Sequence, residues 1–117
     1  SSQYGFSLNY DFSVWDEIPN PATLVENSLL YLYTGFIANP TEVFYITTPA
    51  ATEIPTGLGE TKIINDSVFT IITTDTPTHQ RTYYTALNNK TYVFFYLNYS
   101  EADFSKADSL LETLVLF

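Results

Sequence analysis

Hydrophobic and polar residues alternate along most of this chain, which is the pattern of strands with one buried face. Residues 4–10, for example, place an aromatic or aliphatic side chain at every second position. The predicted strands span residues 4–10, 28–34, 42–48, 61–65, 67–74, 81–87 and 91–98. We therefore expect an antiparallel sheet of about six or seven strands.

Turn-forming residues separate the predicted strands. Asn88 and Asn89 tolerate the positive φ of a tight hairpin turn, so residues 81–87 are expected to pair with residues 91–98. Asp66 marks a second turn, and all six Pro residues fall between predicted strands. Residues of this kind are expected where one strand ends and the next begins.

Three segments depart from the alternation. Residues 49–59 predict a long exposed loop, and residues 20–27 leave room for a short helical turn. Near the end, apolar residues recur on one helical face: Phe104, Ala107, Leu110, Leu111 and Leu114. This spacing predicts an amphipathic helix over residues 105–114, with Asp103 as a candidate N-cap or as part of a capping box with Ser100. An antiparallel sheet with a late helix packed on it is an α+β domain.

The chain is strongly acidic. Four Lys and Arg residues stand against 13 Asp and Glu residues, for a net charge of −9. Nucleic acids and anionic lipids attract proteins through basic patches, which this chain cannot form. The longest apolar run, residues 92–97, is far shorter than the ~20 residues of a membrane-spanning helix. We therefore expect no nucleic-acid partner and no membrane insertion.

Composition also bears on the cellular location. Cys and Met are both absent, which removes disulfides, thiolate metal sites and thiol catalysis. With no Met, the chain is expected to be a processed or excised piece, and residues 1–117 are of a size for one domain. Charged residues make up only 15%, while Thr and Ser are abundant. We therefore expect an extracytoplasmic, secreted or cell-surface setting.

Candidate chemistry in the sequence is sparse. His79 is the single His, in a predicted loop with Asp75, and a general base there would also need a positioned nucleophile. The carboxylates Asp16, Glu17, Glu53, Glu60, Glu101 and Asp103 lack the spacing of a calcium loop. We expect no catalytic residue, no metal site and no cofactor.

The tyrosines are the more promising group. In residues 91–98, Tyr92 and Tyr96 share one face, and Tyr31 shares a face of its own strand with Tyr33. Tyr joins an apolar ring to a hydroxyl, which suits an interface or a sugar-stacking platform. The alternative is that these rings fill a second sheet face covered by loops. The candidate binding residues are Tyr31, Tyr33, Tyr92, Tyr96 and Trp15.

Both ends of the chain resemble one protein family. Tyr4-Gly-Phe-Ser-Leu-Asn-Tyr10 followed by Trp15 resembles the opening of PsbP-like domains. These include the photosystem II extrinsic subunit, a nuclear-import relative that binds Ran, and many bacterial lipoproteins. The close is similar as well, with a Tyr-rich hairpin at residues 82–96, a helix at residues 105–114 and the apolar end at residues 115–117.

The resemblance implies an antiparallel sheet flanked by helices, in a family whose known members bind partners and do not catalyse. It carries over no catalytic residue. Two departures weaken the match in the first half of the chain. Asp11 stands where the family usually has Pro, and residues 20–27 are short for the helix expected there.

The expectation from the sequence is therefore a non-catalytic binding or scaffold domain that docks on another macromolecule. One alternative is a structural subunit of a self-assembling surface filament or layer, which would add strands edge to edge. A second alternative is a carbohydrate-binding module that stacks sugars on Tyr. The partner is accordingly a protein, a second copy of the chain or a glycan.

Overall fold

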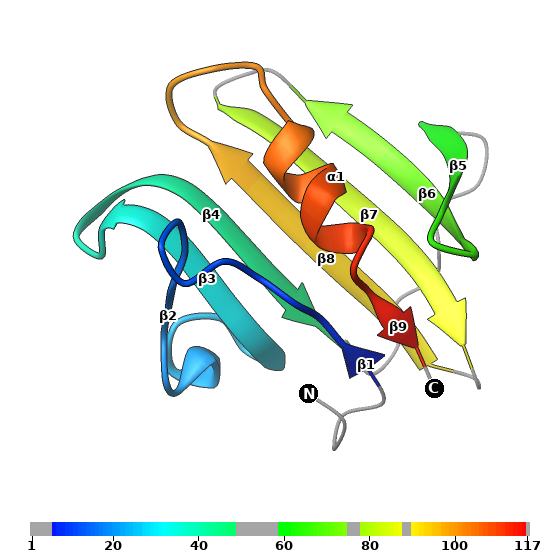
Figure 1. Ribbon diagram of the computed structural model, residues 1–117, viewed down its shortest axis with the longest axis horizontal. Helices are drawn as coiled ribbons and strands as arrows, with labels where there is room; N and C mark the ends of the chain where they lie inside the picture. The colour runs from blue at the N-terminus through cyan, green and yellow to red at the C-terminus, as the bar shows by residue number, and fades with distance from the viewer. Residues whose placement is uncertain (1–5, 49–58, 75–77, 88–89, 117) are drawn as a thin grey trace.

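The computed structural model describes residues 6–48, 59–74, 78–87 and 90–116. Its strands are β1 (Phe6–Ser7), β2 (Asp16–Glu17), β3 (Ser28–Phe36), β4 (Asn39–Thr47), β5 (Glu60–Ile64), β6 (Ser67–Thr74), β7 (His79–Leu87), β8 (Lys90–Asn98) and β9 (Val115–Leu116). Seven of them form one antiparallel sheet in the order β2-β3-β4-β8-β7-β6-β5 (Figure 1). The alternation pattern therefore predicted the long strands β3 to β8 to within a few residues.

The long strands follow one another as hairpins. Strands β5 to β8 form a meander, and β4 pairs with β8, so the β3–β4 hairpin closes onto the meander. At the β5–β6 turn, Asn65 and Asp66 have φ of 47° and 67°, as a two-residue hairpin turn requires. The predicted turn at Asp66 is confirmed. The Asn88-Asn89 turn lies outside the described residues, but Leu87 pairs with Lys90 beside it, and the predicted β7–β8 pairing is confirmed.

The single described α-helix, α1 (Ser105–Leu111), is shorter than predicted. The side chain of Asp103 accepts hydrogen bonds from the backbone N–H and the hydroxyl of Ser105, at 3.0 and 2.7 Å. These bonds stabilise the start of the helix. Asp103 lies one residue before the backbone N-cap, which is Phe104. The helix ends early because Leu114 leads into β9, which pairs with β1 rather than continuing the helical turn.

Two expectations near the N-terminus are met only in part. Within the predicted strand 4–10, the structure assigns Phe6 and Ser7 to β1, which pairs with β9 and not with the large sheet. In residues 20–27, a single 3₁₀ turn, η2 (Pro21–Thr23), takes the place of a helix. The predicted loop 49–59 lies outside the described residues, except for Gly59.

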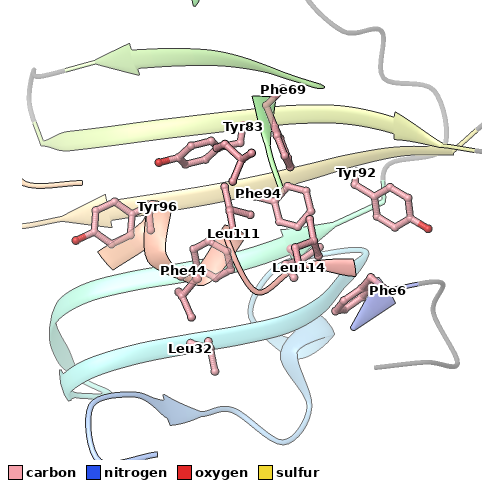
Figure 2. Packing of buried hydrophobic residues seen from close by; sticks show 14 of the residues in the cluster. Phe6, Leu32, Phe44, Phe69, Tyr83, Tyr92, Phe94, Tyr96, Leu111 and Leu114 are labelled. Carbon is pink, nitrogen blue, oxygen red and sulfur yellow. The ribbon is translucent and has the colours of Figure 1, made fainter. Parts of the chain in front are cut away.

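The core lies between one face of the sheet and the layer formed by α1, β1 and β9 (Figure 1). It is rich in aromatic residues from the strands, which meet Leu111 and Leu114 from the C-terminal segment (Figure 2). Phe69 packs edge-on against Phe94, with ring centroids 5.7 Å apart. The predicted antiparallel sheet with a C-terminal amphipathic helix is therefore confirmed, with β-structure dominant. No helix in the described segments is both long and apolar enough to span a bilayer.

Candidate functional site

The two faces of the sheet differ in what lies over them. Alternate residues of a strand point to opposite faces, and α1, β1 and β9 lie on one of these faces (Figure 1). We call the other the open face, since no described helix lies over it. The pairing register places on it Tyr31, Tyr33, Val43, Tyr45, Thr47, Thr61, Ile63, Val68, Thr70, Ile72, Thr74, Gln80, Thr82, Tyr84, Ala86, Thr91, Val93, Phe95 and Leu97.

Charge is distributed unequally between these two faces. The charged residues of strands β3 to β8 all point to the helix side: Glu42, Glu60, Lys62, Arg81 and Lys90. The open face of these strands therefore carries no charged side chain, although the chain has a net charge of −9. Only Asp16, on the short edge strand β2, shares that face among the described strands.

Two of the charges on the helix side hold the helix in place. Lys106 of α1 forms an ion pair with Glu42 at 2.6 Å, and Asp108 approaches Arg81 at 3.7 Å. The Arg81 guanidinium also lies 4.2 Å from the centre of the Phe104 ring. These contacts explain why charge belongs on the helix side, but they do not explain its absence from the open face.

Three aromatic rings form a ladder across the open face. Tyr31, Tyr45 and Phe95 lie opposite one another on β3, β4 and β8. The first two rings are 5.8 Å apart and nearly parallel, at 3°, and the next two are 4.9 Å apart at 28°. Tyr45 therefore has a neighbour on each ring face.

The ladder stays uncharged at neutral pH. Burial raises the pKa of the Tyr31 and Tyr45 hydroxyls, and the nearby Tyr99 raises both further. All three ladder rings are half-buried. A face of this kind offers apolar area and hydroxyl groups without a charge that would have to be desolvated.

The structure separates the five candidate binding residues into two groups. Tyr31 and Tyr33 lie half-buried on the open face. Tyr92 and Tyr96 point to the helix side and are 2% and 0% exposed, and Figure 2 shows both among the core side chains. Trp15 is also buried. These last three side chains leave a partner nothing to contact, so their assignment to a binding surface is corrected here.

The correction has a physical cause. Both faces of β8 are apolar, so the alternation shows which residues share a face but not which face the helix covers. The helix covers the Tyr92 and Tyr96 side, and Phe95 and Leu97 are left on the open face. Sequence reasoning also missed Tyr45, which the register brings beside Tyr31 and Phe95. The hairpin pattern of β3 and β4 could have indicated it.

Tyr96 belongs to a buried polar cluster between the sheet and α1. Its hydroxyl donates to Glu42, which is 4% exposed. Asn98 donates to the Tyr96 oxygen at 3.3 Å, and Lys106 reaches the other Glu42 oxygen. Burial and the Glu42 carboxylate raise the pKa of Tyr96 far above its usual range. Every member has a partner, so the cluster anchors α1 to the sheet.

The candidate catalytic groups do not come together in the described structure. His79 begins β7 opposite Asn98, so it lies in a strand and not in the predicted loop. Asp75 and Glu53 lie outside the described residues. Glu17 accepts a hydrogen bond from Tyr10, and burial together with Glu17 raises the pKa of Tyr10 to about 12. No group of three metal-ligating side chains occurs among the described residues.

A hollow of about 630 Å³ lies where β1, η2 and β3 meet. The Tyr10–Glu17 pair lines it, as does Ser28, whose hydroxyl is buried and has no hydrogen-bond partner in the described segments. A nucleophilic Ser needs a base within hydrogen-bonding reach, and Ser28 has none there. The residues that line this hollow therefore form no catalytic arrangement.

No protein-family model and no curated protein matches this sequence. The fold is similar to a crystal structure of a protein from Bacteroides thetaiotaomicron VPI-5482, with a TM-score of 0.70 and 16% sequence identity. The match covers 97% of this chain and 45% of the Bacteroides chain. This chain thus spans less than half the length of that protein, and the likeness concerns the fold alone.

Proposed function

We propose that this chain is a non-catalytic binding domain of a secreted or cell-surface protein, and that it docks on another protein through the open face. The observation that carries the proposal is the absence of charged side chains from that face across β3 to β8. A water-facing sheet face ordinarily alternates polar and charged residues outward, whereas this one presents Tyr, Phe, Val, Ile and Thr.

The composition of the face supports a protein partner in particular. Interface cores are depleted of charge and enriched in aromatic residues such as Tyr and Phe. The half-buried ladder of Tyr31, Tyr45 and Phe95 matches that composition, with Leu97 and Val93 beside it on β8. The proposal does not depend on a pocket, a metal or a catalytic residue.

The location and the family belong to the proposal as well. The acidic, Thr-rich sequence without Cys or Met supports a secreted or cell-surface setting. Membership of the PsbP-like family stays a prediction from the motifs at the two ends of the chain. That family implies helices flanking the sheet, and the described residues form one α-helix on one side of it.

Site-specific photocross-linking tests the proposal. A benzophenone amino acid replaces Thr82, near the middle of the open face, or Phe12, which is 80% exposed in a loop beside α1. Each protein is irradiated on the surface of the source cells or in their secreted fraction. We expect protein adducts from position 82 and not from position 12, and we expect Tyr45→Glu to abolish them.

The adducts are then identified by mass spectrometry, and binding is repeated with the purified partner and unlabelled chain. Adducts confined to position 12, or adducts at position 82 that persist in the Tyr45→Glu protein, would contradict docking through the open face. Absence of any protein adduct at position 82, from cells that carry the chain, would do the same.

A further inference from the structure

We propose that the partner on the open face is a second copy of this chain, so that two sheets pack face to face in a two-fold dimer. This inference rests on the proposed function, because it names the occupant of the same surface. Three properties of that surface support a second copy: its charge, its area and its packing.

The charge distribution favours a second copy. A two-fold interface brings the same patch of two molecules together, so any charge near its centre meets its own kind. Two copies that each carry a net charge of −9 repel one another over most of their surface. The open face of β3 to β8 is where two copies meet without opposed like charges. An unrelated partner of an acidic chain would instead be selected by basic groups facing acidic ones, and strands β3 to β8 offer no acidic group on this face.

The area of the face is sufficient for a stable dimer. Strands β3, β4, β7 and β8 have nine residues each, which corresponds to a length of about 30 Å. Six neighbouring strands at ~4.8 Å spacing give a width of about 29 Å. Because β6 has eight residues and β5 has five, the six strands together provide roughly 750–800 Å² per copy, about the size of a standard specific interface.

The packing follows known sheet geometry. Two sheets in a sandwich lie about 10 Å apart, with their strands rotated by about 30°. The ladder of Tyr31, Tyr45 and Phe95 forms a ridge on β3, β4 and β8. Two strands away, the smaller side chains of β6 form a lower area: Val68, Thr70, Ile72 and Thr74. A two-fold rotation sets the ridge of each copy against the lower area of the other. Such a dimer buries all three ladder rings.

Sedimentation velocity over about a hundredfold concentration range tests the dimer. We expect the unmodified chain to pass from monomer to dimer as its concentration rises. Phe95→Lys and Thr82→Glu each place two like charges in the interface, so we expect at least about a hundredfold weaker association. Phe12→Lys adds the same charge on the helix side and should leave association unchanged. Circular dichroism confirms that each variant is folded.

The salt dependence of association distinguishes an uncharged interface from a charge-driven contact. Because the proposed interface is uncharged and the two copies repel elsewhere, added NaCl should strengthen association or leave it unchanged. Weaker association in salt would point to a charge-driven contact and would overturn the proposal. Equal dimerisation of the Phe95→Lys, Thr82→Glu and unmodified chains would overturn it too.

The possible failures can be told apart. A monomer at every concentration would overturn the dimer, and the proposed function would survive if position 82 still cross-linked to a different protein. A monomer without cross-links at position 82 would overturn both. Growth beyond the dimer would overturn the two-fold arrangement and favour the filament alternative.

Discussion

Tyr31 and Tyr96 are the same residue type in the same sheet, yet their neighbours give them different roles. The Tyr96 hydroxyl donates to a buried carboxylate, that of Glu42, beneath α1. Tyr31 stacks on Tyr45 on the open face and stays half-buried. The surroundings of the hydroxyl, and not the residue type, decide whether a Tyr stabilises the core or forms part of a binding surface.

Replacing Tyr96 by Phe tests the anchoring role of the buried cluster. The variant keeps the ring but leaves Glu42 with fewer donors in a buried site, which should cost about 1–3 kcal/mol of unfolding free energy. Urea unfolding measures the loss. Tyr33→Phe, on the open face, is the matched control and should change stability by less than about 0.5 kcal/mol. Equal stability of the Tyr96→Phe and unmodified chains would mean that the cluster contributes no net stability.

At the level of elements, the ends of the strands depend on backbone conformations that few residues adopt. Asn65 and Asp66 both have positive φ in the β5–β6 turn, which Asn and Asp tolerate better than most residues. Gly59, just before β5, has φ of +71° and lies against β6. The edge of the sheet is therefore fixed by backbone geometry as well as by side-chain packing.

Gly59→Ala should destabilise the fold by about 2–3 kcal/mol. A Cβ at position 59 would lie 2.2 Å from the backbone oxygen of Ile71, which cannot move without breaking the sheet. Gly35→Ala is the comparison. Gly35 also has positive φ, but its nearest obstacle is the Thr41 hydroxyl at 2.9 Å, which is on a side chain that can rotate. Thermal and urea unfolding should show the larger loss for Gly59→Ala, and equal losses would refute the backbone clash.

At the scale of the whole molecule, the fold is a sheet with one layer on one side and an uncharged face on the other. Two charged residues of the sheet, Glu42 and Arg81, pair with residues of α1, which belongs to the layer formed by α1, β1 and β9. The open face lacks both that layer and those charges. This asymmetry is the property that the proposed function and the proposed dimer share.

The whole chain should lose stability in alkali. Several tyrosines have raised pKa values in the folded state: Tyr10, Tyr31, Tyr45, Tyr83 and Tyr96. The unfolded chain releases these protons near pH 10, whereas the folded chain holds them to higher pH, for Tyr10 to about 12. Their stabilising contribution is therefore complete below pH 10 and declines as the pH rises above it.

Unfolding free energies measured by urea from pH 8 to pH 11 check this expectation. We expect a nearly constant value up to about pH 9 and a fall beyond pH 10. Tyr96→Phe should show a shallower fall, because one hydroxyl whose pKa is raised in the folded state is gone. A fall of the same steepness in that variant would assign the alkaline loss to groups other than Tyr96.

Much of the fold could be predicted from local pattern. Period-two alternation located β3 to β8, Asp66 located a turn, and apolar spacing located the helix, although its N-cap is Phe104 and not Asp103. Two features depended on distant partners. The helix ends at Leu111 because Val115 pairs with Ser7 of β1. His79 lies in a strand because it pairs with Asn98.

The sequence by itself determined an acidic, Cys-free domain of antiparallel strands with a late helix, because strand and helix periods and turn residues are local properties. It also determined which residues share a face of each strand. Only the tertiary structure decided which face is covered, because both faces of β8 are apolar and the helix could pack on either. That choice buries Tyr92 and Tyr96, and it leaves Tyr31, Tyr45 and Phe95 together on the uncharged face.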